Sequence, residues 1–268
     1  MVKQRPIIFG EILFDCLQNK EVLGGAPLNV AWHLHGFDLN PLLISRIGDD
    51  QRGQQALQKI HTWGMDTQGI QIDTSHATSI AECHLNNGQA SYDIKSDQAF
   101  DFIEGEQTLK AIKEEPSLIY QGSLATRQHI SHQTLIALQK KHPSPLFIDI
   151  NLRSPWWHKS HIDTLLQQAT WAKMSDEEIL MLSNSASMST EILQQQAQKF
   201  YQYYSLKKLF VTLGEQGAFV VTEQGVSDIV KYPGHYLRII QIVPHVLNQS
   251  FRVFEPEIMT GDEINHGI

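Results

Sequence analysis

The chain has 268 residues, of which 41% are hydrophobic and 19% charged, and its 29 acidic against 21 basic side chains give a formal net charge of −8. A chain of this length can bury a substantial apolar core, as one large α/β domain or two small ones. The acidic balance argues against binding to nucleic acid or to an anionic membrane, which needs a basic surface, and no segment reaches the ~20 apolar residues that span a bilayer.

Short apolar runs alternate with amphipathic stretches along the chain. The apolar runs predict buried strands at residues 7–12, 41–47, 118–121, 146–150, 171–174 and 208–213. The amphipathic stretches predict helices at residues 26–35, 51–61, 131–141, 161–170, 175–182 and 190–204. Regular alternation of strands and helices predicts an α/β fold with a mostly parallel central sheet covered on both faces.

One stretch departs from this rhythm. Residues 79–85 and 89–94 alternate with period two around Asn86-Asn87-Gly88, which is typical of a β-hairpin. Residues 14–23 can supply further strands on either side of Asn19. A small second sheet beside the main domain, acting as a lid, is therefore expected.

Cys16 and Cys83 are the only cysteines. Two isolated thiols in a chain of this size are typical of a reducing compartment. The apolar run at residues 7–17 carries Glu11 and Asp15, which argues against a signal peptide. These features predict a cytoplasmic protein.

Glycine-rich turns supply the first candidate site. In residues 24–31, Gly24 and Gly25 let the backbone approach a ligand closely, Pro27 suits the first turn of a helix, and Asn29 is expected to point back toward the glycines. An ordinary glycine turn before a helix explains the same pattern. In residues 47–53, Asp49 and Asp50 are expected to cap the following helix, which is a structural role.

Polar residues also follow the later predicted strands. Arg153 comes after the strand that ends near Asp149, where it could clamp an anion or pair with a nearby acid. Ser175 is a natural helix cap, and Glu178 in the same turn could also hold a hydrated Mg²⁺. Residues 211–218 could form a plain hairpin turn or receive a nucleotide.

Taken in order, these motifs resemble the ribokinase-like family of carbohydrate kinases, and within it the bacterial fructokinases. The stretches that carry the resemblance are residues 10–15, 24–31, 47–53, 122–125, 149–157, 173–178 and 212–218. The resemblance implies a three-layer α/β domain over residues 1–232, with lid strands near 12–23 and 79–95. It also implies transfer of the γ-phosphate of ATP to a sugar hydroxyl.

The resemblance assigns roles to individual residues. It implies that Asp15, Gly25 and Asn29 bind sugar hydroxyls, with Tyr92 of the lid covering the sugar. It implies that Arg153 faces the transferring phosphate and that Glu178 organises Mg²⁺. The residues that it places at the adenine nucleotide are Ser175 (where the family has Asn), Thr212, Gly214 and Gly217.

The C-terminal region departs from the family. The family carries Asp-Thr-x-Gly-Ala-Gly-Asp at the start of a helix, whose amides bind the γ-phosphate and whose last Asp is the base. Residues 233–268 form an atypical tail without that motif. Thr260-Gly261-Asp262 echoes it and makes Asp262 a candidate base, although too few residues follow for the expected helix.

Three hypotheses follow from the sequence. The first is an ATP-dependent sugar kinase of fructokinase type with reduced activity, the second a catalytically dead sugar- or nucleotide-binding protein, and the third a non-functional gene product. Fructose is the favoured sugar, with ribose, 2-keto-3-deoxygluconate and a nucleoside left open. Because lids of this family often meet in dimers, a homodimer through the lid is also expected.

Overall fold

The computed structural model describes residues 5–17, 20–86, 89–185 and 189–230, with only the backbone described at 17, 83–86 and 89–92. The whole of the atypical tail, with Asp262, therefore lies outside the described residues, and so does the side chain of Tyr92.

Nine strands of the described chain form one twisted sheet in the order β13-β12-β11-β10-β9-β8-β1-β4-β5. The pairings are parallel from β5 to β11 and antiparallel from β11 to β13, which confirms the mostly parallel sheet. The strands are β1 (Ile7–Phe9), β4 (Leu42–Gly48), β5 (Ile70–Asp73), β8 (Ile119–Gly122), β9 (Leu146–Asp149), β10 (Trp171–Ser175), β11 (Lys208–Thr212), β12 (Ala218–Thr222) and β13 (Gly225–Val226).

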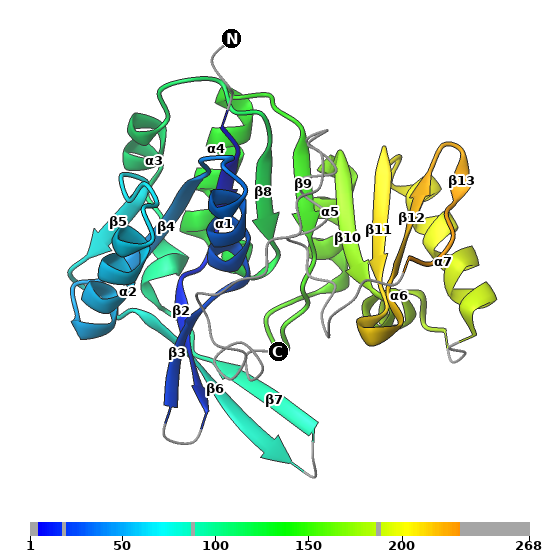
Figure 1. Ribbon diagram of the computed structural model, residues 1–268, viewed down its shortest axis with the longest axis horizontal. Coiled ribbons are helices and arrows are strands. Elements are labelled where there is room, and N and C mark those ends of the chain that lie inside the picture. Colours follow the sequence, from blue (N-terminus) through cyan, green and yellow to red (C-terminus); the bar gives the residue numbers. More distant parts are fainter. Residues whose placement is uncertain (1–4, 18–19, 87–88, 186–188, 231–268) are drawn as a thin grey trace.

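Helices cover both faces of this sheet and give the three-layer arrangement (Figure 1). Alternate strand residues point to opposite faces, so that Ile8 packs with α1 and α2 while Ile7 and Phe9 pack with the other helices. One layer holds α1 (Ala26–Gly36) and α2 (Gln51–Thr62). The other holds α3 (Gly105–Ala111), α4 (His129–Lys141), α5 (Lys159–Gln168), α6 (Asp176–Ser183) and α7 (Thr190–Tyr203).

A second sheet of four strands projects from one edge of the domain, at the bottom of Figure 1. Its order is β3-β2-β6-β7, with β2 parallel to β6 and the other pairs antiparallel. The strands are β2 (Leu13–Leu17), β3 (Lys20–Gly24), β6 (Ser79–Asn86) and β7 (Gln89–Ile94). Both predicted stretches therefore contribute to the lid, which is confirmed.

The structure corrects some element boundaries. The first strand ends at Phe9 rather than residue 12, because Gly10 adopts φ 147° and the chain turns there before it enters the lid at Leu13. The helix expected at 161–170 spans Lys159–Gln168. β5 and α3 were not predicted from the sequence.

Candidate functional site

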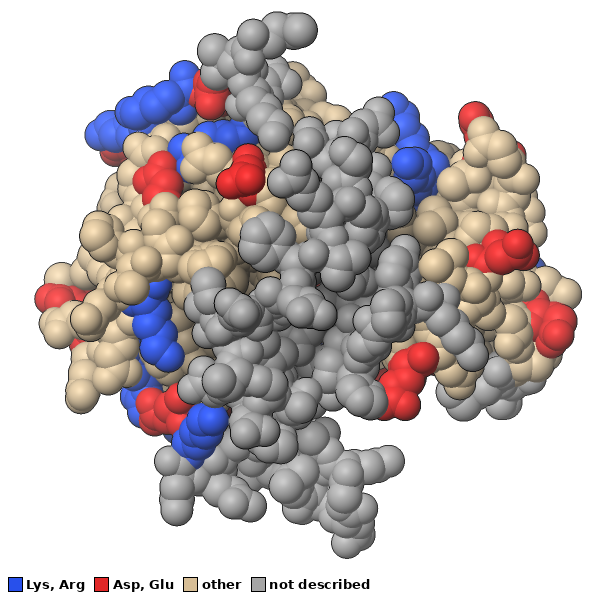
Figure 2. Space-filling model, viewed as in Figure 1, with Lys and Arg blue, Asp and Glu red and all other residues tan. Residues whose placement is uncertain are grey.

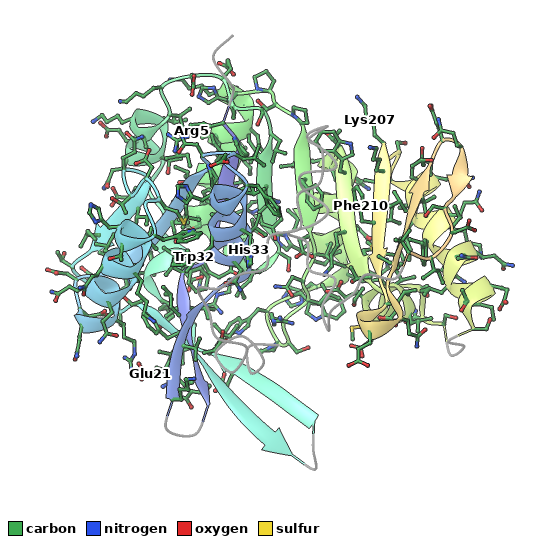
Figure 3. All side chains as sticks on the ribbon, in the orientation of Figure 1. Arg5, Glu21, Trp32, His33, Lys207 and Phe210 are labelled. Carbon is green, nitrogen blue, oxygen red and sulfur yellow. The ribbon has the colours of Figure 1, made fainter. Side chains whose placement is uncertain are left out.

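The motifs singled out in the sequence lie at one edge of the main sheet. In parallel strands all carboxyl ends share an edge, and β1, β8, β9, β10 and β11 are consecutive neighbours. In Figure 3, Arg5 and Lys207, which precede β1 and β11, lie at the top, whereas Glu21 of the lid lies at the bottom. The residues that follow these strands therefore face the lid.

The double-glycine bend rests on the chain that follows β1. Gly25 has φ 108°, and a Cβ atom there would lie 2.5 Å from the carbonyl oxygen of Glu11. Only glycine fits this close approach, which explains the bend in physical terms. Gly25 precedes α1 as its N-cap without a side-chain cap of its own.

The Glu11 carboxyl group fills the space beneath this bend. Its side chain is buried, and burial raises its pKa to about 7 against the opposing effects of the backbone N–H groups of Glu11 and Ala26 and of the Arg153 and Arg127 guanidinium groups. Among the described residues, its Oε2 atom has no hydrogen-bond partner. An acidic group at this position complements the positive N-terminal end of α1.

The charge of Arg153 acts on the Asp15 carboxyl group. Burial raises the pKa of Asp15 to about 6, and the positive charge of Arg153 opposes that rise. Asp15 lies on β2, with its carboxylate against Gly24, and Arg153 follows β9. The positive charge of Arg153 therefore acts on both carboxyl groups, that of Asp15 and that of Glu11.

Glu178 joins two segments of the site. Its Oε1 atom accepts a hydrogen bond from the Leu152 backbone N–H at 2.8 Å, and its Oε2 atom accepts one from the Ser175 N–H at 2.7 Å. The Ser175 hydroxyl accepts the Glu178 N–H in return at 3.2 Å, which completes a capping box and confirms Ser175 as the cap. Each carboxylate oxygen keeps a second lone pair, which suits contact with a water of a hydrated cation.

A buried ion pair lies beneath this loop. Lys173 Nζ is 3.2 Å from Asp149 Oδ1, and Tyr120 donates its hydroxyl to Asp149 Oδ2 at 3.3 Å. Burial raises the pKa of Asp149, which the charge of Lys173 opposes, while Asp149 and Glu178 hold the pKa of Lys173 above its ordinary value despite burial. The pair joins β9 and β10, the strands that precede Arg153 and Glu178.

The turn after β11 combines a buried threonine with two unusual glycines. Thr212 is buried and lies opposite Ser175 in the β10–β11 register. Gly214 has φ 56° with open space where a side chain would stand, whereas Gly217 has φ 114° and its backbone packs against the Val230 carbonyl group. The hairpin interpretation is confirmed, because β11 and β12 pair in antiparallel fashion across this turn.

Asn29 stands on the first turn of α1 and lines a pocket of about 50 Å³ between α1, α2 and β3. Glu21 and Lys20 of β3, Trp32 of α1 and Lys59 of α2 also line it. Figure 3 shows Trp32 on α1 above Glu21 of the lid. The predicted orientation of Asn29 toward the glycines stays a prediction.

The remaining predictions have mixed outcomes. Asp50 caps α2 by accepting the Gly53 N–H at 2.8 Å, as expected, whereas Asp49 is exposed and its backbone N–H donates to the Asp73 carbonyl group. Within the described residues, there is no cluster of three or more metal-ligating side chains. Sequence reasoning gave Glu11 and Lys173 no role of their own; the only signal was an ionisable residue inside an apolar strand pattern.

Charged side chains of both signs lie on the surface of the described residues. Over the described part of the face in Figure 2, basic and acidic side chains are interspersed and form no continuous basic patch. In the part of the chain that the structure describes, no helix is both long enough and apolar enough to cross a membrane.

Comparison with known proteins gives a consistent picture. A family model described as pfkB family carbohydrate kinase matches residues 2–235. A putative sugar kinase of Pyrococcus horikoshii is 26% identical over 222 residues, covering 78% of this chain and 66% of that protein. Probable fructokinase-4 of Arabidopsis thaliana is 26% identical over 229 residues, covering 81% and 68%. The chain thus spans about two thirds of the length of these relatives.

Solved structures share the fold. The fructokinase of Vibrio cholerae O395 with fructose, ADP and calcium bound has a TM-score of 0.71 at 23% identity, covering 85% of this chain and 76% of that one. The Pyrococcus horikoshii sugar kinase in complex with ATP has a TM-score of 0.71 at 22% identity, covering 87% and 78%. Identities this low establish the architecture alone.

Proposed function

The chain belongs to the pfkB family of carbohydrate kinases, and on this premise we propose that it transfers the γ-phosphate of ATP to a hydroxyl group of a small sugar, with fructose as the preferred acceptor. The observation that carries the proposal is the convergence of the segments that hold Arg153, Glu178 and Thr212 at the carboxyl edge of the sheet, on the side of the lid. Fructose is proposed as the acceptor because fructokinases are among the similar proteins, one of them solved with fructose bound.

The sugar side of the proposed site consists of Asp15, Gly25 and Asn29. A carboxylate and an amide offer acceptors and donors for hydroxyl groups, and the glycine bend lets the ligand approach the backbone. Tyr92 of β7 would cover the sugar from the lid. Because the charge of Arg153 acts on Asp15, we infer that a sugar bound to Asp15 would present a hydroxyl group toward the guanidinium.

The phosphate side consists of Arg153 and Glu178. Phosphoryl transfer depends mainly on positioning and on stabilising the negative charge that spreads over the phosphate oxygens, and a guanidinium does both. Glu178 would hold Mg²⁺ through the waters of the ion, and the bound ion would neutralise charge on the phosphates. Ser175, Thr212, Gly214 and Gly217 would line the nucleotide, and the open space beside Gly214 leaves room for it.

A second function is favoured by one specific observation, namely that residues 233–268 lack the family's Gly-Ala-Gly-Asp segment. Loss of a general base typically lowers a rate by ~10²–10⁴-fold. The chain could thus bind sugar and nucleotide with little or no turnover, with Asp262 as the one candidate base in the tail.

A coupled assay of ADP release, run with fructose, ribose, 2-keto-3-deoxygluconate and a nucleoside, tests the kinase proposal. We expect turnover with fructose above the background of ATP hydrolysis, and lower turnover in Asp262→Asn if that residue is the base. Absence of turnover with every acceptor would contradict the kinase proposal.

Calorimetry with fructose and with ATP then separates the two functions. Binding without turnover supports the second function, and absence of binding to either ligand removes both. Sedimentation of the same sample tests the expected homodimer. The edge strands of the lid sheet, at which a second lid could pair, are β3 and β7.

A further inference from the structure

Arg127 forms a fully buried ion pair outside the residues assigned above. It follows the 3₁₀ turn Leu124–Thr126. Its Nε donates to Asp101 Oδ1 at 2.8 Å and its Nη2 donates to Asp101 Oδ2 at 2.7 Å, with the two side chains 2% and 0% exposed. A bidentate pair of this kind fixes the plane of the guanidinium as well as its position.

The same guanidinium holds the base of the lid. Its Nη1 donates to the Ile94 carbonyl oxygen at 3.4 Å, and its Nη2 also donates to the Lys95 carbonyl oxygen. Ile94 is the last residue of β7, the strand that carries Tyr92. The point where this lid strand leaves its sheet is therefore fastened to the main domain by Arg127.

The guanidinium of Arg127 also lies over two aromatic rings. Its carbon lies 4.4 Å from the ring centroid of Trp156 and 4.8 Å from that of Phe100. The Trp156 backbone N–H donates to the Arg153 carbonyl oxygen at 2.8 Å, so that Trp156 belongs to the same turn as Arg153. Desolvated cation–π contacts of this geometry hold the ring and the cation together.

We propose that Arg127 is a positioning residue that fixes the base of lid strand β7 relative to the turn that carries Arg153. The inference rests on the proposed function, because it sets how the lid residues over the sugar stand relative to the group that faces the phosphate. Arg127 joins the two segments through polar contacts, since it donates to the Ile94 and Lys95 carbonyl oxygens and lies over the Trp156 ring. These contacts add to the apolar cluster in which Ile94 and Phe100 lie and against which Trp156 packs.

The choice of arginine follows from geometry. One planar group must satisfy a carboxylate and two carbonyl oxygens while it also lies over two aromatic rings. A lysine ammonium has three donors and no planar face, so it can keep the charge but cannot make these contacts together. The conservative replacement is therefore informative.

Hydrogen exchange measured by mass spectrometry tests the proposal without any need for activity. In Arg127→Met we expect faster exchange in both segments, residues 93–96 and 152–157, by roughly 10- to 100-fold, as for the loss of a hydrogen bond to a charged group. Arg127→Lys should give a smaller increase in both. Arg46→Met is the matched control, since Arg46 also pairs with buried Asp73 but contacts neither segment.

A second variant keeps the test valid if Arg127→Met does not fold. Trp156→Leu removes one of the two aromatic rings that contact the Arg127 guanidinium and leaves the Arg127–Asp101 pair intact. We expect it to accelerate exchange at residues 93–96, because the guanidinium that loses this contact also bonds to Ile94 and Lys95. The proposal is overturned if Arg127→Met leaves exchange unchanged in either segment, or if Trp156→Leu accelerates exchange at residues 152–157 only.

Steady-state kinetics test whether Arg127 also affects catalysis. We expect Arg127→Lys to lower kcat/KM for the sugar by up to about 10²-fold with KM for ATP unchanged, because displacement of a positioned group by about 1 Å has effects of this size. Equal changes in the KM for the sugar and the KM for ATP would contradict a positioning role. If the wild type shows no sugar turnover, the proposed function fails while the exchange result still decides the role of Arg127.

Discussion

The backbone N–H of Leu152 donates a 2.8 Å hydrogen bond to the carboxylate of Glu178. This bond fastens the turn that carries Arg153 to the first turn of α6, whose cap Ser175 donates to the other carboxylate oxygen. The position of Arg153 therefore depends on a residue of a neighbouring strand-helix unit. Glu178 would act on the proposed phosphate site through this bond even where no metal is bound.

Glu178→Gln should weaken this link, because an amide presents one acceptor oxygen where the carboxylate presents two. A hydrogen bond to a charged group contributes about 1.5–3 kcal/mol, and we expect a loss of that order in the free energy of unfolding, measured in urea. The neighbouring Glu177 is exposed, so Glu177→Gln is the matched control and should leave stability nearly unchanged. Equal stability of the two variants would contradict the role of Glu178.

Gly25→Ala should destabilise the protein more than Gly225→Ala, although the two glycines have nearly the same φ, 108° and 109°. Both substitutions strain the backbone by about 1–3 kcal/mol. Only at Gly25 does the new Cβ also meet a backbone atom, the Glu11 carbonyl oxygen, whereas nothing lies within 4 Å at Gly225. The difference between their unfolding free energies measures the cost of the steric clash with the Glu11 carbonyl oxygen. We expect Gly25→Ala to lose about 1–3 kcal/mol more than Gly225→Ala.

If the two alanine variants lose the same stability, the Gly25 bend does not pack tightly against Glu11, and the packing argument for the proposed sugar side fails. Calorimetry with fructose on the folded Gly25→Ala protein then tests the ligand role separately, since a displaced bend should weaken sugar binding while Gly225→Ala leaves it unchanged.

The convergence of the motifs could be predicted from the sequence because it depends only on local features. Arg153, Ser175 and Thr212 each end a short apolar run, and parallel strands with helical crossovers bring such ends to one edge. The β10–β11 register, with Ser175 opposite Thr212, confirms this for two of them.

What could not be predicted depends on contacts between distant segments. Gln71 interrupts the short apolar pattern of β5, and it is buried only because its amide group bonds with Glu104 and Thr108 near the start of α3. Glu11 looks like a polar interruption in the sequence, and its burial requires the N-terminal end of α1 above it. Arg127 likewise receives its role from Asp101, Ile94 and Trp156, which belong to three other segments.

Lys173→Met should be strongly destabilising, because it leaves the buried Asp149 carboxylate without its cation. Breaking a buried ion pair costs about 3–5 kcal/mol. Lys159→Met removes a pair of the same 3.2 Å length, with Asp163, in which the lysine side chain is 58% exposed. For that control we expect about 0.5 kcal/mol or less.

Urea unfolding of both lysine variants checks the contrast, and the double variant Lys173→Met with Asp149→Asn tests its cause. The second substitution removes the unpaired charge, so the double variant should recover part of the lost stability. Failure to recover any would mean that packing of the lysine chain, and not the charge of Asp149, explains the loss.

Glu11→Gln should change how stability depends on pH. Burial raises the pKa of Glu11 from 4.5 to about 7 in the folded protein, and the unfolded chain keeps the ordinary value. Between these values the folded state holds a proton that the unfolded state has released. The stability that this group contributes is therefore complete below pH 4.5 and is lost as the pH rises through 7.

The pKa difference corresponds to about 3 kcal/mol. Because glutamine cannot ionise, the stability of Glu11→Gln relative to the wild type should rise by an amount of this order between pH 4.5 and pH 8, as measured by urea unfolding at both values. Parallel pH profiles for Glu11→Gln and the wild type would mean that Glu11 is ionised without penalty in the folded protein, so that the positive end of α1 and the guanidinium groups of Arg153 and Arg127 fully offset its burial.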